Sequence, residues 1–348
     1  MSVSEAITKE KITAKYNPGA EIRGDGWLHL HRNENLLIES AWTVEAAKAL
    51  VEKVAIAAYP NANSDTLRAA LAELYGVKPQ NIFVGNGSDE VLADLFHLLR
   101  HSYARMSVLD VCFKIFLLLA ERYDFQLDIL PGHTFSSGQI DVDGWKGLAV
   151  IDSPNAITSA AFTFERINDL AKDENSFVIW DNAYGEFAGD IVPTAIQKNI
   201  VVVRTFSKFY GLAGLRIGYC IADEAIVAEL LARKDAFNVN SMAQVMALEA
   251  LRRHDEFVAI RERLVECRRE LIQRLHGLGF RTHPAAGNFV LATHPDFSAE
   301  LIQNELMQRQ IAVRRFEARL TSNYVRITVP PMPDVERLAA ALEQIITN

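Results

Sequence analysis

Two patterns of hydrophobic and polar residues alternate along the chain from residue 64 onward. Stretches with apolar residues at helical spacing take turns with short runs in which nearly every residue is apolar, such as 148–152 and 200–205. Continuous apolar runs are typical of strands in a parallel sheet, because helices cover both faces of such a sheet. The pattern therefore predicts an α/β fold with a mostly parallel central sheet.

The spacing and the turn residues between segments locate the individual elements. We expect helices over residues 42–57, 64–75, 88–99, 115–122, 164–172, 223–234 and 241–276. We expect strands over residues 81–85, 105–109, 126–130, 148–152, 177–181, 200–205 and 216–221. A second, smaller α+β unit follows, with strand 288–293, helix 299–310, strands 311–314 and 324–329, and a last helix from Asp334.

The elements divide the chain into three expected parts. Residues 1–40 have little periodicity and contain Pro18, Gly19, Gly24 and Gly26, so they are expected to form an arm that packs on the small domain or on a partner subunit. The boundary between the two domains is placed within the long helix. A large domain over 41–255 and a small α+β domain over 256–348 result.

Composition and charge exclude several classes of protein. The chain has 348 residues, 49% of them hydrophobic, which suits a globular protein of two domains, and its apolar runs are shorter than the ~20 residues of a membrane-spanning helix. The net charge of −8 argues against a nucleic-acid partner. Cys112, Cys220 and Cys267 have no metal-ligand spacing, and the N-terminus lacks the apolar core of a secretory signal. We expect a cytoplasmic protein without a metal site.

The candidates for function are the polar residues just after each strand, because ligands of an open α/β sheet bind beyond the carboxyl ends of its strands. The first candidate is the segment Gly85-Asn86-Gly87-Ser88-Asp89-Glu90, which follows strand 81–85. Glycines permit a ligand to come close, and the N–H groups at the start of a helix attract an anion. The segment predicts a phosphate site, although Ser88 with Asp89 also makes an ordinary helix start.

Two more strand ends carry a carboxylate and an amine. Strand 177–181 ends in Asp181, with Tyr184 shortly after it, and strand 200–205 leads to Lys208. Aromatic neighbours of Lys208 predict partial burial, which would lower the pKa of its ammonium group, as an imine-forming lysine needs. An amine for an aldehyde, an anion site for a phosphate and a carboxylate for a ring nitrogen are together what pyridoxal 5′-phosphate requires.

The segment RTFSKFYGLAGLRIGY, residues 204–219, closely resembles the cofactor-lysine segment of fold-type I aminotransferases, and of the histidinol-phosphate aminotransferase family in particular. The resemblance extends over most of the chain. Its other motifs are RNEN at 32–35, Tyr59-Pro60, LRAALAELYGV at 67–77, VGNGSDE at 84–90, DNAYGEF at 181–187, Gly287-Asn288-Phe289 and YVRITV at 324–329.

The resemblance implies a role for each matching residue. Lys208 would bind the cofactor aldehyde as an internal aldimine and then carry the proton between the substrate and the cofactor, Asp181 would pair with the ring nitrogen, and Tyr184 would bind the 3′ oxygen. The cofactor would also contact Gly87, Ser88, Asp89, Phe113, Asn155, Ser207, Arg216 and Tyr59, the last from a second subunit. The substrate would contact Arg326, Asn33, Tyr16 and Arg314. A homodimer that acts on an amino acid and a 2-oxo acid is therefore expected.

Three segments depart from the family pattern. The usual Ser-Pro-Asn-Asn-Pro-Thr-Gly reads Ser-Pro-Asn-Ala-Ile-Thr-Ser over 153–159, so Ala156 replaces an asparagine that binds the 3′ oxygen, and Asn155 is the candidate to compensate. Leu36-Leu37-Ile38-Glu39 and Asp110-Val111-Cys112-Phe113-Lys114 also differ from the family. A decarboxylase, lyase or cyclase of the same fold is therefore a second interpretation.

A protein that binds a dinucleotide is an interpretation from another class. Gly85 and Gly87 lie between a strand and a helix, and Asp110 ends the next strand. Glu90, however, stands where the third glycine of the dinucleotide motif should be, and the lysine segment would have no role.

Overall fold

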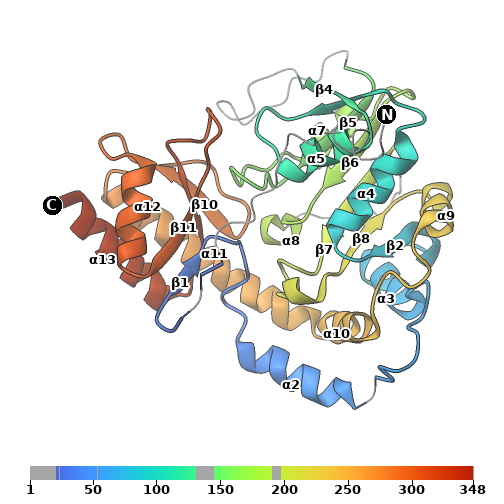
Figure 1. Ribbon diagram of the computed structural model, residues 1–348, viewed down its shortest axis with the longest axis horizontal. Helices are drawn as coiled ribbons and strands as arrows, with labels where there is room; N and C mark the ends of the chain where they lie inside the picture. The colour runs from blue at the N-terminus through green and yellow to red at the C-terminus, as the bar shows by residue number, and fades with distance from the viewer. Residues whose placement is uncertain (1–20, 23, 53, 131–144, 190–196, 348) are drawn as a thin grey trace, which may run out of the picture.

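The computed structural model describes residues 21–22, 24–52, 54–130, 145–189 and 197–347, and builds them around two sheets (Figure 1). Within these residues the larger sheet has seven strands in the order β2-β8-β7-β6-β5-β3-β4. Only β8 runs antiparallel to its neighbours in this sheet. The strands are β2 (Ile82–Gly85), β3 (Arg105–Val108), β4 (Gln126–Ile129), β5 (Leu148–Asp152), β6 (Phe177–Asp181), β7 (Ile200–Thr205) and β8 (Gly218–Ile221). The α/β fold with a mostly parallel sheet is confirmed.

Helices pack on both faces of this sheet and make two separate cores. Along β7, Val201 and Val203 face one core, and Val202 faces the other, as the alternation of side chains along a strand requires. The first core is closed by α4 (Ser88–Leu99), α5 (Lys114–Arg122) and α9 (Glu224–Arg233). The second is closed by α3 (Asp65–Tyr75), α7 (Phe164–Leu170) and α10 (Ser241–Arg252), with α2 (Ser40–Val51) packed against α10. Burial on both faces explains the continuous apolar runs of the sequence.

The smaller sheet has the order β1-β11-β12-β10-β9, and all of its strands except β1 come from the C-terminal part of the chain (Figure 1). Its strands are β1 (Leu28–Leu30), β9 (Arg281–Thr282), β10 (Phe289–Thr293), β11 (Ile311–Arg315) and β12 (Val325–Thr328), and its helices are α11 (His254–Gly277), α12 (Ala299–Gln308) and α13 (Met332–Thr347). The short strand β1 pairs in parallel with β11, so residues of the expected arm add an edge strand to the small sheet.

One element was predicted wrongly: residues 241–276 do not form a single helix. They form α10 and α11, which are separated at Arg253. Basic Arg252 ends the first helix, and acidic Asp255 and Glu256 begin the second. This order of charges stabilises the end of one helix dipole and the start of another, whereas the apolar spacing continues across the break. The domain boundary at 255/256 stays a prediction.

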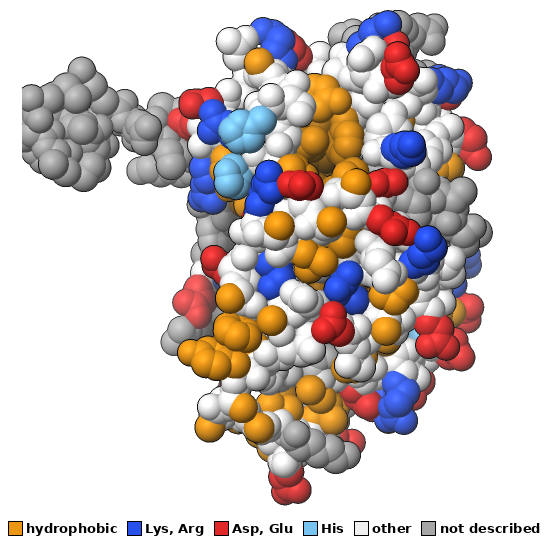
Figure 2. Space-filling view, turned by 90° about the vertical axis from the view of Figure 1, so that its right-hand side faces the viewer, with side chains coloured by type: hydrophobic (Ala, Val, Ile, Leu, Met, Phe, Trp, Pro, Cys, Tyr) orange, Lys and Arg blue, Asp and Glu red, His pale blue; other side chains and the backbone are white. Residues whose placement is uncertain are grey.

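Charges of both signs are interspersed on the face shown in Figure 2, without a broad patch of basic side chains there. No helix among the described residues is long and apolar enough to cross a bilayer.

Candidate active site

A cavity of about 880 Å³ lies where the carboxyl ends of the large sheet meet the small sheet. Its floor comes from residues that end or follow β3, β5, β6 and β7 and from the start of α4, and its other wall comes from β11, β12 and the segment 316–321. The volume is in the range of sites for small molecules and cofactors. Most of the predicted site residues line it: Asn33, Ser88, Asp89, Phe113, Asp181, Tyr184, Ser207, Lys208, Arg216, Arg314 and Arg326.

Lys208 enters the cavity from the turn that follows β7. Its side chain is half-buried, its Nζ donates to the carbonyl of Arg32 at 3.3 Å, and the same nitrogen lies 5.6 Å from the centre of the Tyr184 ring. The turn is held by buried Phe206 and Phe209 on either side of the serine and lysine. The buried aromatic side chains therefore fix the turn that carries Lys208, and with it the place of the amine in the cavity.

Asp181 ends β6 and is almost fully buried, with 5% of its surface exposed. The pKa of its carboxyl is raised to about 7: burial and the charge of Asp89 raise it, and the hydrogen bond from Ala183 and the charge of Lys208 lower it. Its Oδ1 accepts only one backbone hydrogen bond among the described residues, from Ala183 at 3.2 Å. A buried carboxyl with this little compensation favours a cationic partner such as a protonated ring nitrogen.

Tyr184 follows Asp181 by three residues, and its hydroxyl accepts a hydrogen bond from Asn33 Nδ2 at 3.0 Å. Asn33 is itself buried and has a left-handed backbone, and its N–H donates to Thr328 Oγ1 at 3.0 Å. The hydroxyl proton of Tyr184 is thereby left to donate into the cavity. Asn33, expected beside the substrate, contacts the tyrosine of the predicted cofactor site.

The start of α4 has the shape and the donors of an anion site. Gly87, which has a φ of 87°, precedes the helix, and the first N–H groups of a helix have no partner within it. A Cβ on Gly218 would lie 2.2 Å from the Ser88 nitrogen, so the neighbouring strand must carry glycine here. Ser207 Oγ is buried, and no described residue hydrogen-bonds to it. Arg216 Nη2 lies 2.9 Å from Asp89 Oδ2 beside these groups.

This arrangement fits the phosphate of pyridoxal phosphate. A phosphate is stabilised by N–H groups at a helix start, by a hydroxyl and by a guanidinium, and each of these groups is present. The buried Ser207 hydroxyl would gain the hydrogen-bond partner that the described residues do not give it.

Arg326 and Arg314 lie across the cavity on paired strands. They are opposite each other in the register of β11 and β12. Arg326 donates from Nη1 to the carbonyl of Ala156 at 2.8 Å and from Nη2 to the carbonyl of His31 at 3.2 Å, and its guanidinium lies 5.2 Å from the Phe289 ring. Two guanidinium groups on one wall favour an anionic substrate.

The predicted site residues Asn155 and Tyr59 are not part of the cavity lining. Asn155 does not line the cavity: its Oδ1 accepts from the backbone of Ile157 and Thr158, and its Nδ2 donates to the carbonyl of Val111 at 2.7 Å. Its carboxamide is occupied inside its own turn, so it does not replace the asparagine lost at 156. Tyr59 is 82% exposed and does not line this chain's cavity. Tyr16 lies outside the described residues.

The segment 36–39, which departs from the family pattern, also does not line the cavity. Ile38 packs against Gly211 in the turn after Lys208, where a Cβ on the glycine would lie 2.5 Å from Ile38 Cδ1. The segment therefore packs against the turn after Lys208 on a side that does not face the cavity.

Sequence reasoning missed Asp152, a second buried carboxylate of the cavity. It ends β5 as Asp181 ends β6, and the two are partners in the register of the parallel pair. The rule that selected Asp181 from the end of its strand applies equally to Asp152.

Comparison with known proteins gives the family. Residues 25–345 match the family described as "Aminotransferase class I and II". The chain belongs to this family. A histidinol-phosphate aminotransferase of Thiobacillus denitrificans is 33% identical to it over 95% of this chain and 94% of that protein, and one of Microcystis aeruginosa is 30% identical over 96% of each.

Solved structures give the same fold. The histidinol-phosphate aminotransferase of Sinorhizobium meliloti, in complex with pyridoxal-5′-phosphate, superposes with a TM-score of 0.83 at 23% identity over 92% of this chain and 90% of that chain. The L-threonine-O-3-phosphate decarboxylase of Porphyromonas gingivalis superposes with a TM-score of 0.77 at 22% identity over 92% and 100%. Family membership and the fit of the cavity identify an aminotransferase that depends on pyridoxal phosphate.

Proposed function

We propose that this aminotransferase moves an amino group between an amino acid or amino phosphate and a 2-oxo acid, with histidinol phosphate as the first candidate donor. The observation that carries the proposal is the cavity itself, in which Lys208 and Asp181 face a wall that carries Arg314 and Arg326. The names of the similar aminotransferases from Thiobacillus denitrificans and Microcystis aeruginosa support the choice of donor.

Pyridoxal phosphate, when bound, supplies an aldehyde for the amine and a ring that withdraws electrons from the substrate. Lys208 would bind the aldehyde and afterwards act as general base and acid, moving the proton at the substrate α-carbon. Asp181 would hold the proton on the ring nitrogen. Tyr184, oriented by Asn33, would donate to the 3′ oxygen. The start of α4, Ser207 and Arg216 would hold the phosphate.

The substrate side would be divided between two arginines. Arg326 would bind the carboxylate of the 2-oxo acid or the amino acid in a bidentate pair, which its planar fork favours. Arg314, opposite Arg326 and 5.7 Å from the Phe316 ring, would bind the phosphate of an amino phosphate. One cavity could then accept two different anions in the two halves of the reaction.

The test is a product assay with histidinol phosphate and 2-oxoglutarate. We expect the amino group to appear in glutamate, and we expect histidinol without the phosphate to react with a much higher KM. Arg314→Gln should raise KM for the phosphorylated donor by about tenfold to a hundredfold, the effect of losing one charge-assisted contact, and leave KM for glutamate nearly unchanged. Release of ammonia from histidinol phosphate, or of carbon dioxide from an amino acid, without any 2-oxo acid would contradict transamination and favour the lyase or decarboxylase interpretation.

We propose further that two copies of the chain form the active unit. Apolar side chains are exposed on α2 and on the segment that joins it to α3: Val44, Val51, Ile56 and Tyr59. Tyr59 stacks on Phe237, which is also exposed, with 4.5 Å between the ring centres. A second copy would cover these side chains and receive Tyr59 at its cofactor phosphate.

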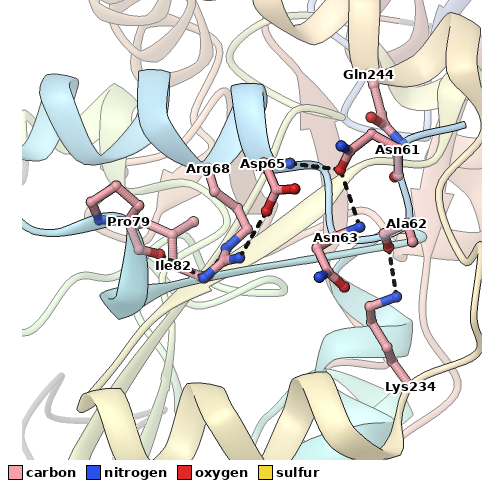
Figure 3. A network of polar contacts seen from close by, with 9 residues as sticks. All are labelled: Asn61, Ala62, Asn63, Asp65, Arg68, Pro79, Ile82, Lys234 and Gln244. Atoms are coloured by element: carbon pink, nitrogen blue, oxygen red, sulfur yellow. Dashed lines mark hydrogen bonds and ion pairs between the residues drawn. The ribbon is translucent and has the colours of Figure 1, made fainter.

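The chain just after Tyr59 is firmly anchored (Figure 3). Asn61 Oδ1 accepts from the backbone of Asp65 at 2.9 Å, Gln244 donates to the carbonyl of Asn61 at 3.0 Å, and Lys234 donates to the carbonyl of Ala62 at 2.6 Å. Tyr59 is therefore presented outward from a fixed base.

We predict that the protein sediments as a dimer and that Tyr59→Phe, which removes only the hydroxyl, weakens cofactor binding about tenfold through the loss of one hydrogen bond to a phosphate. Analytical ultracentrifugation and a cofactor titration measure the two effects. A monomer with full activity would contradict this assembly.

We also propose a cytoplasmic location, supported by the three cysteines, which are all free thiols.

A further inference from the structure

The buried carboxylate of Asp152 has no role in the function proposed above, yet it faces the same cavity. Only 2% of its surface is exposed. A carboxylate is rarely buried without partners, because its desolvation costs several kcal/mol in a protein interior. The hydrogen-bond partners of Asp152 therefore indicate its role.

Three N–H groups from two segments converge on this carboxylate. Oδ2 accepts from the backbone of Phe113 at 3.1 Å and from the backbone of Ala156 at 2.9 Å, and Oδ1 accepts from Asn155 Nδ2 at 3.0 Å. Phe113 directly precedes α5, so the carboxylate also lies at the positive end of a helix dipole. One side chain thus fastens the segment before α5 to the turn after β5.

Both fastened segments lead to groups that would contact cofactor or substrate. Phe113 lines the cavity. The carbonyl of Ala156, whose N–H is held by Asp152, accepts from Arg326 Nη1 at 2.8 Å. Hydrogen bonds therefore link Asp152 to the backbone of Ala156, and the backbone of Ala156 to the arginine on the opposite wall.

The charged form of this carboxylate is also disfavoured by its surroundings. Burial raises the pKa of Asp152 well above the ordinary value, and the charge of Asp181 on β6 raises it further, while the backbone N–H groups lower it. Cys112, in the segment before α5, is the other titratable group that interacts with it. An asparagine of the same shape would avoid this cost, but its amide nitrogen would then face either Asn155 Nδ2 or the two backbone donors.

We propose that Asp152 is a positioning residue of the active site, which sets the places of Phe113 and, through the backbone of Ala156, of Arg326. The position of Arg326 matters because a bidentate pair with a carboxylate tolerates little displacement. The role of Arg326 in this inference rests on the proposed function, whereas the hydrogen bonds to Phe113 and Ala156 do not.

The test compares Asp152→Asn with Ser153→Ala in the holoenzyme. Ser153 is the adjacent buried residue, and its Oγ accepts from the backbone of Phe162 at 2.8 Å, so its replacement also removes one hydrogen bond at this strand end. Ser153 does not line the cavity. The measurements are the visible circular dichroism of the bound cofactor, KM for the 2-oxo acid together with kcat, and the thermal midpoint of the cofactor-free protein.

For Asp152→Asn we expect a reduced circular dichroism of the cofactor and a KM raised about tenfold to a hundredfold, as for the loss of a charge-assisted hydrogen bond, with a smaller change in kcat. We expect the midpoint at pH 8 to change little, because the removal of an unfavourable buried charge is offset by the contact between the new amide nitrogen and the N–H donors around it. Ser153→Ala should lower the midpoint and leave the cofactor signal and KM unchanged.

A variant Asp152→Asn with the wild-type cofactor signal and KM would overturn the proposal. If this variant does not fold, hydrogen exchange in the wild type decides: amides of Phe113 and Ala156 should exchange as slowly as those of β5, and exchange as fast as in exposed loops would overturn it. A wild type whose spectrum responds to no amino acid would contradict the proposed function instead, and the cofactor signal of the variant would still test Asp152.

Discussion

Replacing Lys208 with alanine is expected to abolish the visible absorbance of the lysine-bound cofactor and to lower kcat by about 10⁴-fold or more. General acid–base catalysis contributes up to about 10⁴ by itself, and the covalent attachment of the cofactor is lost as well. Lys208 Nζ is held in the cavity by the carbonyl of Arg32 and lies 5.6 Å from the centre of the Tyr184 ring. Absorbance spectra and a product assay measure both effects.

Two further variants make this result specific. Lys208→Arg keeps the positive charge, but its guanidinium stays protonated and cannot attack an aldehyde, so it should fail as the alanine variant does. Lys78→Ala removes an exposed lysine that pairs with Glu224 at 2.8 Å, and it should leave spectrum and activity unchanged, because such surface pairs contribute little. An active Lys208→Ala enzyme with its colour intact would show that another amine carries the cofactor.

Asp181→Asn is expected to lower turnover by roughly 10²- to 10³-fold while the cofactor stays bound. An uncharged amide no longer favours the protonated ring nitrogen, and breaking a buried ion pair costs about 3–5 kcal/mol. The start of α4, Ser207 and Lys208 still hold the cofactor in this variant. Turnover with saturating cofactor, together with a titration of cofactor binding, separates the two effects.

The same variant should be more stable than the wild type when the cofactor is absent. The pKa of Asp181 is about 7 in the fold and roughly 3.9 in the unfolded chain, so between these values the folded state keeps a proton that the unfolded state has lost. The free energy of unfolding of the wild type therefore falls as the pH rises from 4 to 7. At pH 8 Asp181→Asn should gain on the order of a few kcal/mol, which thermal unfolding measures, and at pH 4 the gain should vanish.

If Asp181→Asn is more stable than the wild type but turns over more slowly, the carboxylate serves the reaction and destabilises the fold. If Asp181→Asn instead lost stability at pH 8 and kept its turnover, the carboxylate would serve the fold, and its role toward the ring nitrogen would be wrong.

The residues at strand ends could be predicted from sequence because their positions follow from local pattern. Continuous apolar runs locate β6 and β7, the site lies beyond their carboxyl ends, and the glycines before α4 predict an anion site without any knowledge of distant contacts. Asp181, Ser88 and Lys208 were found in this way, and the structure brings all three to one cavity.

The features that sequence reasoning missed depend on contacts between distant segments. Asn155 has the residue type of a cofactor ligand, but its carboxamide is occupied by the turn and by the carbonyl of Val111. The partners of Asp152 include Phe113, which is 39 residues away in the chain. Strand β1 has only three residues, too few for a periodic pattern, and forms because β11 offers it an edge. The spacing of hydrophobic residues along the chain does not predict such contacts between distant segments.

The most direct test of the account is to incubate the purified protein with pyridoxal phosphate, reduce it with borohydride and map the modified peptide by mass spectrometry. Reduction makes the bond between cofactor and lysine permanent, so the label identifies the residue that held the aldehyde. The account predicts a yellow protein before reduction and a single pyridoxyl label on Lys208. A protein that stays colourless, or a label on any other lysine, would contradict it.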